Sequence, residues 1–92
     1  MSEYIEIETE SGDDDTQMLL YTNLKLTEQA HEYYDSQAEM EEGSPVAQAL
    51  SVIEGIATLT IDNSDMILTR TPDAQWHTII ADVSAALKDF FL

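Results

Sequence analysis

Cysteine is absent from this 92-residue sequence, and basic residues are scarce, with 3 Lys or Arg against 19 Asp or Glu. Without cysteine the chain can form no disulfide, no thiolate metal site and no thiol nucleophile. The formal net charge of −16 repels nucleic acids and anionic membranes, so we expect neither as a ligand. Basic proteins and cations are the partners that such a charge favours.

Long apolar runs are also absent. No stretch approaches the ~20 apolar residues that span a bilayer, and the start, Met1-Ser2-Glu3, lacks the basic residues and apolar segment of a signal peptide. Hydrophobic residues nevertheless make up 43% of the chain, enough for one folded core at this length. We therefore expect a single domain over residues 1–92, a cytoplasmic location and a monomer.

The beginning of the chain carries β-strand patterns. Residues 4–8 alternate apolar and charged side chains, which predicts a strand with Ile5 and Ile7 on its buried face. Residues 11–15 are turn formers and like charges, so we expect an exposed loop there. Residues 17–26 then predict a second strand, paired antiparallel with the first.

The pattern weakens over residues 27–42. We favour a strand around Ala30, Tyr33 and Tyr34, followed by a loop over residues 36–42, although that polar segment could also begin a helix. The first 42 residues hold 13 acidic residues and 1 basic residue, so the surface charge is concentrated in this half.

A helix is predicted over residues 45–54. The hydroxyl of Ser44 can accept a hydrogen bond from the first turn, and Pro45 suits the first helical position because its φ is already helical. Apolar residues then recur at i, i+3, i+4 and i+7. Gly55 follows where a residue that tolerates positive φ ends a helix.

The remainder predicts a hairpin and a long helix. Residues 57–61 and 66–69 read as two strands joined by the polar turn 62–65. Asp73 is placed to cap a helix over residues 74–90. That helix has the strongest apolar periodicity of the chain, at Trp76, Ile79, Ile80, Val83, Ala86, Leu87, Phe90 and Phe91.

Together these patterns predict an α+β fold. We expect a mostly antiparallel sheet of about four to five strands, with two helices, about 45–54 and 74–90, packed on one face. The apolar stripe of the second helix should anchor the core, because each such side chain contributes roughly 1.5–3 kcal/mol when buried. Trp76 belongs to this stripe, so we expect it in the core before any role as a ligand platform.

Two carboxylate clusters are candidate sites for a divalent cation. Asp13, Asp14 and Asp15 are consecutive, but they lack the ligand spacing, central glycine and closing glutamate of an EF-hand loop. Asp62 and Asp65 lie in the predicted hairpin turn, where such residues are explained by hydrogen bonds to their own backbone. A solvated loop and a turn are the favoured interpretations.

Catalysis has weak support in the sequence. His31 and His77 each lack a nearby His or Cys at ligand spacing. A nucleophilic pair of Ser84 with His77, seven residues apart on one helix, would have no acid to orient it and no oxyanion site. We therefore expect a protein that is not an enzyme.

Several of these segments, in this order and spacing, resemble the N-terminal domain of Nfu/NifU-type iron–sulfur scaffold proteins. They are Ser44-Pro45-Val46-Ala47 with Leu50, Ile53-Glu54-Gly55-Ile56, Asp65-Met66-Ile67, and Trp76 opening the last helix. The family usually carries a Pro- and Asn-rich motif after its first strand, where residues 11–16 stand in this chain. Its cluster-holding Cys-x-x-Cys lies in a separate C-terminal domain, so we expect a stand-alone version of the accessory domain.

The resemblance implies a non-catalytic interaction module that serves iron–sulfur cluster assembly or delivery through protein partners. It also implies that this chain binds no cofactor itself, since an iron–sulfur cluster needs thiolates. The alternative is a protein that binds iron or another divalent cation weakly through its exposed carboxylates.

Overall fold

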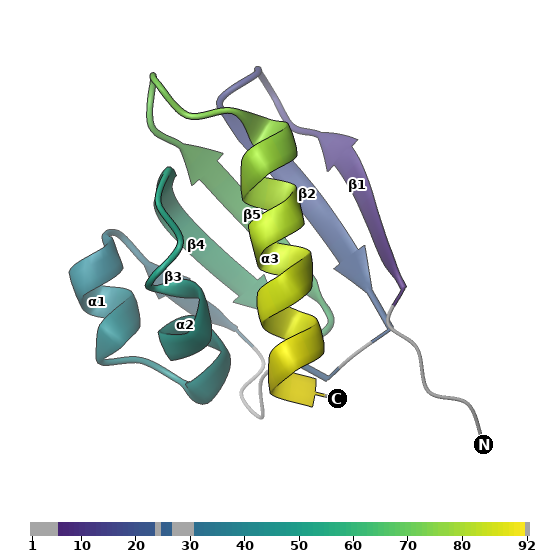
Figure 1. Cartoon of the computed structure of the whole chain (residues 1–92), viewed down its shortest axis with the longest axis vertical. Coiled ribbons are helices and arrows are strands. Elements are labelled where there is room, and N and C mark those ends of the chain that lie inside the picture. Colours follow the sequence, from purple (N-terminus) through teal and green to yellow (C-terminus); the bar gives the residue numbers. More distant parts are fainter. Residues whose placement is uncertain (1–5, 24, 27–30, 92) are drawn as a thin grey trace.

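The computed structural model describes residues 6–23, 25–26 and 31–91. These residues form a five-stranded sheet in the order β1-β2-β5-β4-β3, in which each pair of neighbouring strands is antiparallel (Figure 1). The strands are β1 (Ile7–Ser11), β2 (Gln17–Thr22), β3 (Glu32–Tyr34), β4 (Ile56–Asp62) and β5 (Asp65–Arg70).

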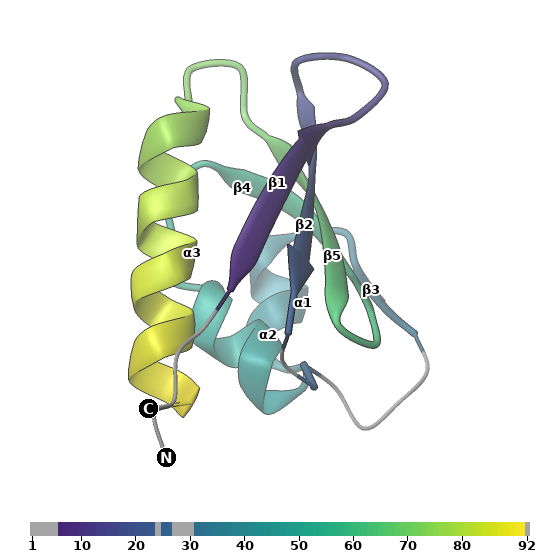
Figure 2. The ribbon, with the colours of Figure 1, turned by 90° about the vertical axis from the view of Figure 1, so that its right-hand side faces the viewer.

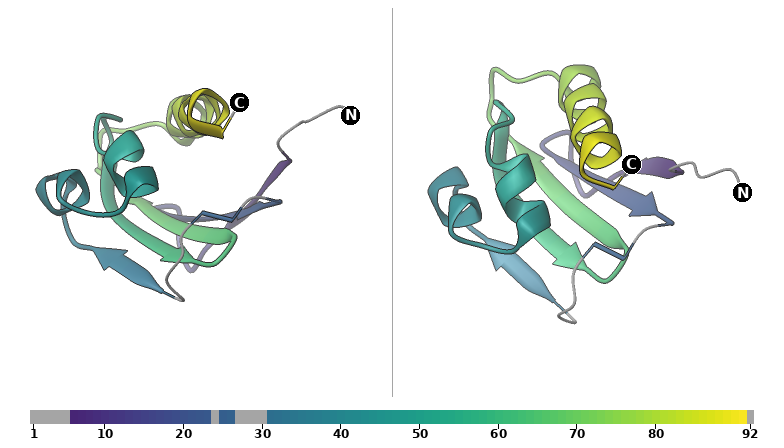
Figure 3. Two further views of the ribbon diagram at one scale, coloured as in Figure 1. Left: turned by 90° about the horizontal axis from the view of Figure 1, so that it is seen from below. Right: turned by 60° about the horizontal axis from the view of Figure 1, so that its bottom comes forward.

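Helices lie on one face of this sheet. They are α1 (Gln37–Glu41), α2 (Pro45–Leu50) and α3 (Trp76–Phe91). Seen along the sheet, α2 and α3 lie over the same face, and α1 lies beside α2 near the β3 edge (Figures 2 and 3). Within the described part of the chain, the other face of the sheet carries no helix, and no helix is long and apolar enough to cross a bilayer.

The core lies between the sheet and the helices. Alternate residues of the three central strands face it, because successive side chains of a strand point to opposite sides. The helices contribute the facing side chains, and the stripe of α3 is buried at Ile79, Val83 and Leu87. The core residues with 0% exposure are Leu20, Met40, Ala47, Leu50, Leu59, Ile61, Leu68, Val83 and Leu87.

The predicted α+β fold, its antiparallel sheet and its hairpin are therefore confirmed, with one additional short helix. The predicted strand at residues 4–8 lies partly outside the described residues, as do Leu24 and Ala30. Ser11 was expected in the loop but pairs with Met18 at the end of β1, because the ladder continues to the turn. The turn is closed by a 3.0 Å hydrogen bond from Gly12 N to the Gln17 carbonyl.

Helix α2 ends four residues earlier than predicted, at Leu50. The hydroxyl of Ser51 donates to the Gln48 carbonyl at 2.7 Å, and the Ser51 N–H bonds the same oxygen at 3.2 Å, so the last turn tightens and closes. The start is as predicted, with Ser44 Oγ accepting from Ala47 N at 3.4 Å. Gly55 has the predicted positive φ, +98°, but it lies five residues beyond the last residue of α2 and so does not end that helix.

Helix α1 occupies the segment where a loop was favoured, so that prediction was wrong. Ser36 Oγ accepts from Glu39 N at 3.2 Å, and the Glu39 carboxylate reaches back to Asp35 N at 3.2 Å, which satisfies donors at the helix start. Met40 is fully buried and anchors the helix to the core. One buried side chain and a cap suffice here because the helix has little more than one turn.

Asp73 was expected to cap α3, but the helix begins two residues later than predicted. Its first turn hydrogen-bonds to the Gln75 carbonyl, which accepts from Thr78 N at 3.2 Å and Ile79 N at 3.1 Å. The Asp73 carboxylate instead accepts from the Thr71 hydroxyl at 3.0 Å, in the loop that connects β5 to α3. The capping position therefore belongs to Gln75.

Candidate functional site

Residues 12–17 form a turn, the acidic loop, that holds the first candidate carboxylates. Asp14 Oδ1 accepts from the Thr16 hydroxyl and from Thr16 N at 2.8 Å, and these two hydrogen bonds hold the pKa of the Asp14 carboxyl below its ordinary value of 3.8. Asp13 N donates to Gln17 Oε1 at 3.0 Å. The loop is therefore shaped by its own side chains, as the turn interpretation of this segment expects.

The acidic loop is also joined to the loop before α3, and Arg70 makes the connection. Its Nε donates to the Asp15 carbonyl at 2.9 Å, and its Nη2 lies 3.3 Å from the Asp15 carboxylate. The Trp76 indole donates to the same Asp15 carbonyl at 2.6 Å. The remaining guanidinium donor, Nη1, lies 3.2 Å from three further carbonyls, those of Thr71, Pro72 and Ala74.

This arrangement limits what the three aspartates offer to a cation. The Asp15 carboxylate faces a guanidinium, whose positive charge repels a metal ion at the same place. The carboxylate of Asp14 is occupied by Thr16. Among residues 6–23, 25–26 and 31–91, no group of three or more His, Cys, Asp or Glu side chains is placed to hold a metal ion.

The second pair of candidate carboxylates lies at the tip of the β4–β5 hairpin. Asp62 and Asp65 are direct partners across the two strands, and both are exposed. Asn63 makes the turn with a φ of +62°, a conformation that asparagine tolerates better than most residues. The Ser64 carbonyl accepts from Thr22 N at 3.1 Å and from the Thr22 hydroxyl at 2.7 Å, so the turn also holds the end of β2.

The histidines are separated in the structure. His31 precedes β3 and is exposed, and His77 is exposed in the first turn of α3. Ser84 lies on the same helix, but seven residues rise about 10.5 Å along a helix axis. A direct hydrogen bond between these two compact side chains would have to span two helical turns.

A buried acidic residue that sequence reasoning missed is Glu32, which is 6% exposed. The Tyr34 hydroxyl donates to Glu32 Oε1 and accepts from Ser44 N at 3.1 Å. This connection joins β3 to the residue that caps α2. Only the β3–β4 pairing, which puts Glu32 opposite Ile61 on the core side of the sheet, reveals it.

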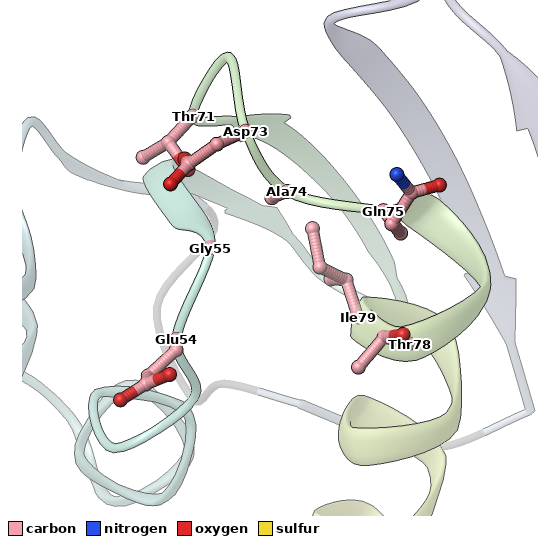
Figure 4. Close-up of a pocket in the computed structure, with 8 residues that line it drawn as sticks. All are labelled: Glu54, Gly55, Thr71, Asp73, Ala74, Gln75, Thr78 and Ile79. Carbon is pink, nitrogen blue, oxygen red and sulfur yellow. The ribbon is translucent and has the colours of Figure 1, made fainter.

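A pocket of about 320 Å³ lies where the loop after α2 meets the start of α3 (Figure 4). Gly55 lines the pocket close to Ala74, so that a Cβ at position 55 would come within 2.8 Å of the Ala74 Cβ. The lining mixes acidic, polar and apolar residues, without His, Cys, Lys or Arg: Glu54, Gly55, Thr71, Asp73, Ala74, Gln75, Thr78 and Ile79. Such a lining can accept and donate hydrogen bonds, and within it the Thr71 hydroxyl already donates to the Asp73 carboxylate at 3.0 Å.

A second, more polar pocket of about 490 Å³ lies at the open end of the β1–β2 ladder. The Glu6 N–H donates to Asn23 Oδ1 at 3.1 Å, which joins two of its lining residues. It is lined by Glu6, Ile7, Glu8, Tyr21, Thr22 and Asn23, so it too is acidic and contains no His, Cys, Lys or Arg. Neither pocket brings together the residues that the sequence singled out.

The family model described as "Scaffold protein Nfu/NifU N terminal" matches this sequence over residues 7–92. The chain belongs to this family. The resemblance read from the motifs is thereby confirmed, and it links this Nfu N-terminal domain to iron–sulfur cluster biology. No curated protein sequence matches the chain significantly.

Solved structures share the fold of this Nfu N-terminal domain. The crystal structure of protein SAV1430 from Staphylococcus aureus has a TM-score of 0.71 at 14% identity, covering 88% of this chain and 96% of the other. The solution structure of the same protein gives 0.64 at 13% identity, covering 89% and 88%. A solution structure from Staphylococcus epidermidis gives 0.61 at 13% identity, covering 92% and 98%. At these identities the likeness concerns the fold alone.

The residues of this Nfu N-terminal domain do not fit an iron–sulfur cluster as a resident group. Protein ligands of such clusters are cysteine thiolates, with histidine replacing some of them in one class. The sequence has no cysteine and 2 histidines. Both histidines are exposed, and they lie in separate parts of the fold, His31 before β3 and His77 in α3, so they supply no substitute pair.

Proposed function

We propose that this domain serves iron–sulfur cluster assembly or delivery as a non-catalytic accessory module that contacts a protein partner. The observation that carries the proposal is the family match over residues 7–92 in a chain without cysteine. A domain of this family that cannot supply thiolates must act on clusters indirectly. Recognition of another protein is the indirect route that a small folded domain of this charge offers.

The polar features of the structure support a binding role over catalysis. Arg70 and Trp76, which would suit a site for substrate, are both engaged with backbone carbonyls of the acidic loop. We further propose that the domain is cytoplasmic and that it is a monomer, the latter because a net charge of −16 opposes self-association. Sedimentation at physiological salt tests the monomer; a stable dimer would contradict it.

Capture of partners from a native lysate tests the main proposal. The tagged domain should enrich proteins that assemble iron–sulfur clusters or receive them, identified by mass spectrometry. A tagged, folded protein of similar size and charge is the control, because it removes partners that bind any acidic surface. Enrichment of no cluster-assembly or cluster-receiving protein over this control would contradict the proposal.

Cation binding through exposed carboxylates is the competing hypothesis, and an NMR titration separates the two. We expect ferrous iron or calcium to cause small, uniform shifts by screening, because Asp15 faces a guanidinium and Asp14 is occupied by Thr16. Saturable shifts confined to Asp13, Asp14 and Asp15, or to Asp62 and Asp65, would favour cation binding instead.

A further inference from the structure

The sheet face opposite the helices, here called the open face, carries a continuous row of side chains across all five strands. The strand registers place these residues side by side, because Cα partners in neighbouring strands point to the same face. In order from β1 to β3 the row is Glu10, Leu19, Ile67, Thr60 and Tyr33. Four strand spacings of about 4.8 Å give the row a width of about 19 Å.

A second row lies beside the first and is mostly acidic. It runs through Glu8, Tyr21, Asp65 and Asp62, again as direct partners from β1 to β4. The carboxylates of Glu8, Asp62 and Asp65 are exposed, as is that of Glu10 in the first row. No strand position of the open face is occupied by Lys or Arg, so its charge has one sign.

The middle of the open face is apolar. Leu19 and Ile67 are direct partners at its centre, and they are only half-buried although no described helix covers them. Tyr33 ends the row and is 54% exposed. Its hydroxyl donates to Asp35 Oδ1 at 3.1 Å, which raises the pKa of Tyr33 and fixes the ring at the rim. An apolar centre bordered by polar groups is the usual anatomy of a protein interface.

We propose that the open face docks a protein surface that presents Lys or Arg side chains around an apolar centre. The charge of the open face favours this partner. Glu10 ends the first row, and the second row carries the carboxylates of Glu8, Asp62 and Asp65, so a basic protein surface complements them. A second copy of this chain would bring the same carboxylates face to face. This inference rests on the proposed function, because it names the surface through which an accessory domain would contact its partner.

The helix side of the molecule does not offer the same combination. Its apolar side chains are turned into the core at Ile79, Val83 and Leu87, whereas Val52 and Phe90 are exposed. Its outward charges are mixed, since Lys88 stands beside Asp89 on α3. On the open face, by contrast, the apolar Leu19 and Ile67 are direct partners and the strand positions carry charge of a single sign.

A synthetic peptide, Lys-Lys-Leu-Phe-Leu-Lys-Lys, is a probe of this chemistry, and its glutamate counterpart, Glu-Glu-Leu-Phe-Leu-Glu-Glu, is the control. Titration of the folded domain with the basic peptide should give saturable NMR shifts at open-face amides, centred on Leu19, Ile67 and Tyr33. The acidic peptide should give none. Shifts spread evenly over the surface would overturn the proposal.

Two charge-matched variants separate docking from general attraction. Glu8→Lys with Asp65→Lys reverses two open-face charges, and Asp82→Lys with Asp89→Lys makes the same net change on α3, where both residues are exposed. We expect the dissociation constant to rise about tenfold for the first and less than about threefold for the second. Equal weakening would overturn the proposal.

Ile67→Thr, which keeps a β-branched residue, should weaken binding about threefold through the apolar centre.

The open face and the proposed function can fail separately. If the Glu8→Lys, Asp65→Lys variant still captures the same cluster-assembly proteins from lysate as the original chain, the docking surface is wrong and the function stands. If the original chain captures none of them, while the basic peptide maps to the open face, the function is wrong and the surface stands. Thermal unfolding of each variant shows that the comparison is made on folded protein.

Discussion

Replacing Arg70 with methionine should destabilise this domain more than any change on its acidic surface. The arginine side chain is only 16% exposed, and it donates to backbone carbonyls of two separate segments, that of Asp15 in the acidic loop and those of the loop before α3. Methionine keeps much of the apolar stem and removes every donor. The carbonyls then lose a partner that fixes both loops.

The magnitude follows from the number of effective hydrogen bonds. Nη1 has two hydrogens for its three carbonyls, so with Nε there are about three bonds to backbone, each contributing about 1 kcal/mol net. The expected loss is therefore about 3 kcal/mol. For a domain of this size, that loss lowers the melting temperature by about 12–24 °C.

Asp15→Asn is the matched control, because it removes the ion pair and keeps the Asp15 carbonyl that Arg70 and Trp76 share. The Asp15 side chain is 86% exposed, so the pair should contribute less than about 1 kcal/mol. Both variants are compared with the original chain by urea unfolding followed by circular dichroism. If Arg70→Met costs no more than Asp15→Asn, the backbone hydrogen bonds do not stabilise the domain as argued.

Other predictions concern single positions. Gly55→Ala should cost about 1–3 kcal/mol in urea unfolding, because φ is +98° and the new Cβ would meet Ala74; an unchanged midpoint would contradict this. Val83→Asp should abolish cooperative unfolding, because it puts a charge at a fully buried site; a normal melting curve would disprove it. The Asp14 carboxyl should titrate below 3.8 by NMR, because Thr16 bonds its ionised form. Its contribution to stability is present above 3.8 and lost as the pH falls through the lower folded pKa. Thr16→Val should move the midpoint toward 3.8 and reduce that contribution, because the hydroxyl donor is lost while the hydrogen bond from the backbone N–H of residue 16 remains.

The elements with complete local signals could be predicted from the sequence. The α3 stripe repeats over four turns, and its buried positions Ile79, Val83 and Leu87 are spaced by four residues. The β4–β5 hairpin combines alternation with a turn that Asn63 can make at positive φ. In both cases most of the residues that the local sequence pattern predicts to be buried pack in the core.

The ends of the short helices could not be predicted in the same way. Helix α1 has a single fully buried residue, Met40, so it has no apolar stripe to detect. Helix α2 ends where the Ser51 hydroxyl donates a hydrogen bond to the Gln48 carbonyl. Such side-chain bonds to the backbone are a local alternative to continuing the helix by one more turn. The apolar spacing at Ile53 suggested that extra turn, yet Ile53 reaches the core from the loop that follows.

The sites depended even more on tertiary structure. The side chains of Arg70 and Trp76 donate to main-chain carbonyls. Because every residue has such a carbonyl, no sequence motif predicts these hydrogen bonds. The open face consists of one or two residues from each strand and becomes visible only when all four strand registers are known. The sequence shows that most acidic residues lie in the first part of the chain. The strand registers show, in addition, that Glu8 and Glu10 share a face of the sheet with Asp62 and Asp65 of the β4–β5 hairpin.

The hydrogen bond from the Trp76 indole to the Asp15 carbonyl has a practical consequence. Trp76 is the sole tryptophan of the sequence, and its ring is where the acidic loop, the end of β5 and the start of α3 meet. Intrinsic fluorescence excited at the indole therefore reports on this junction alone. A change in Trp76 fluorescence can therefore report detachment of the acidic loop without an added label, and stopped-flow mixing can follow it in time.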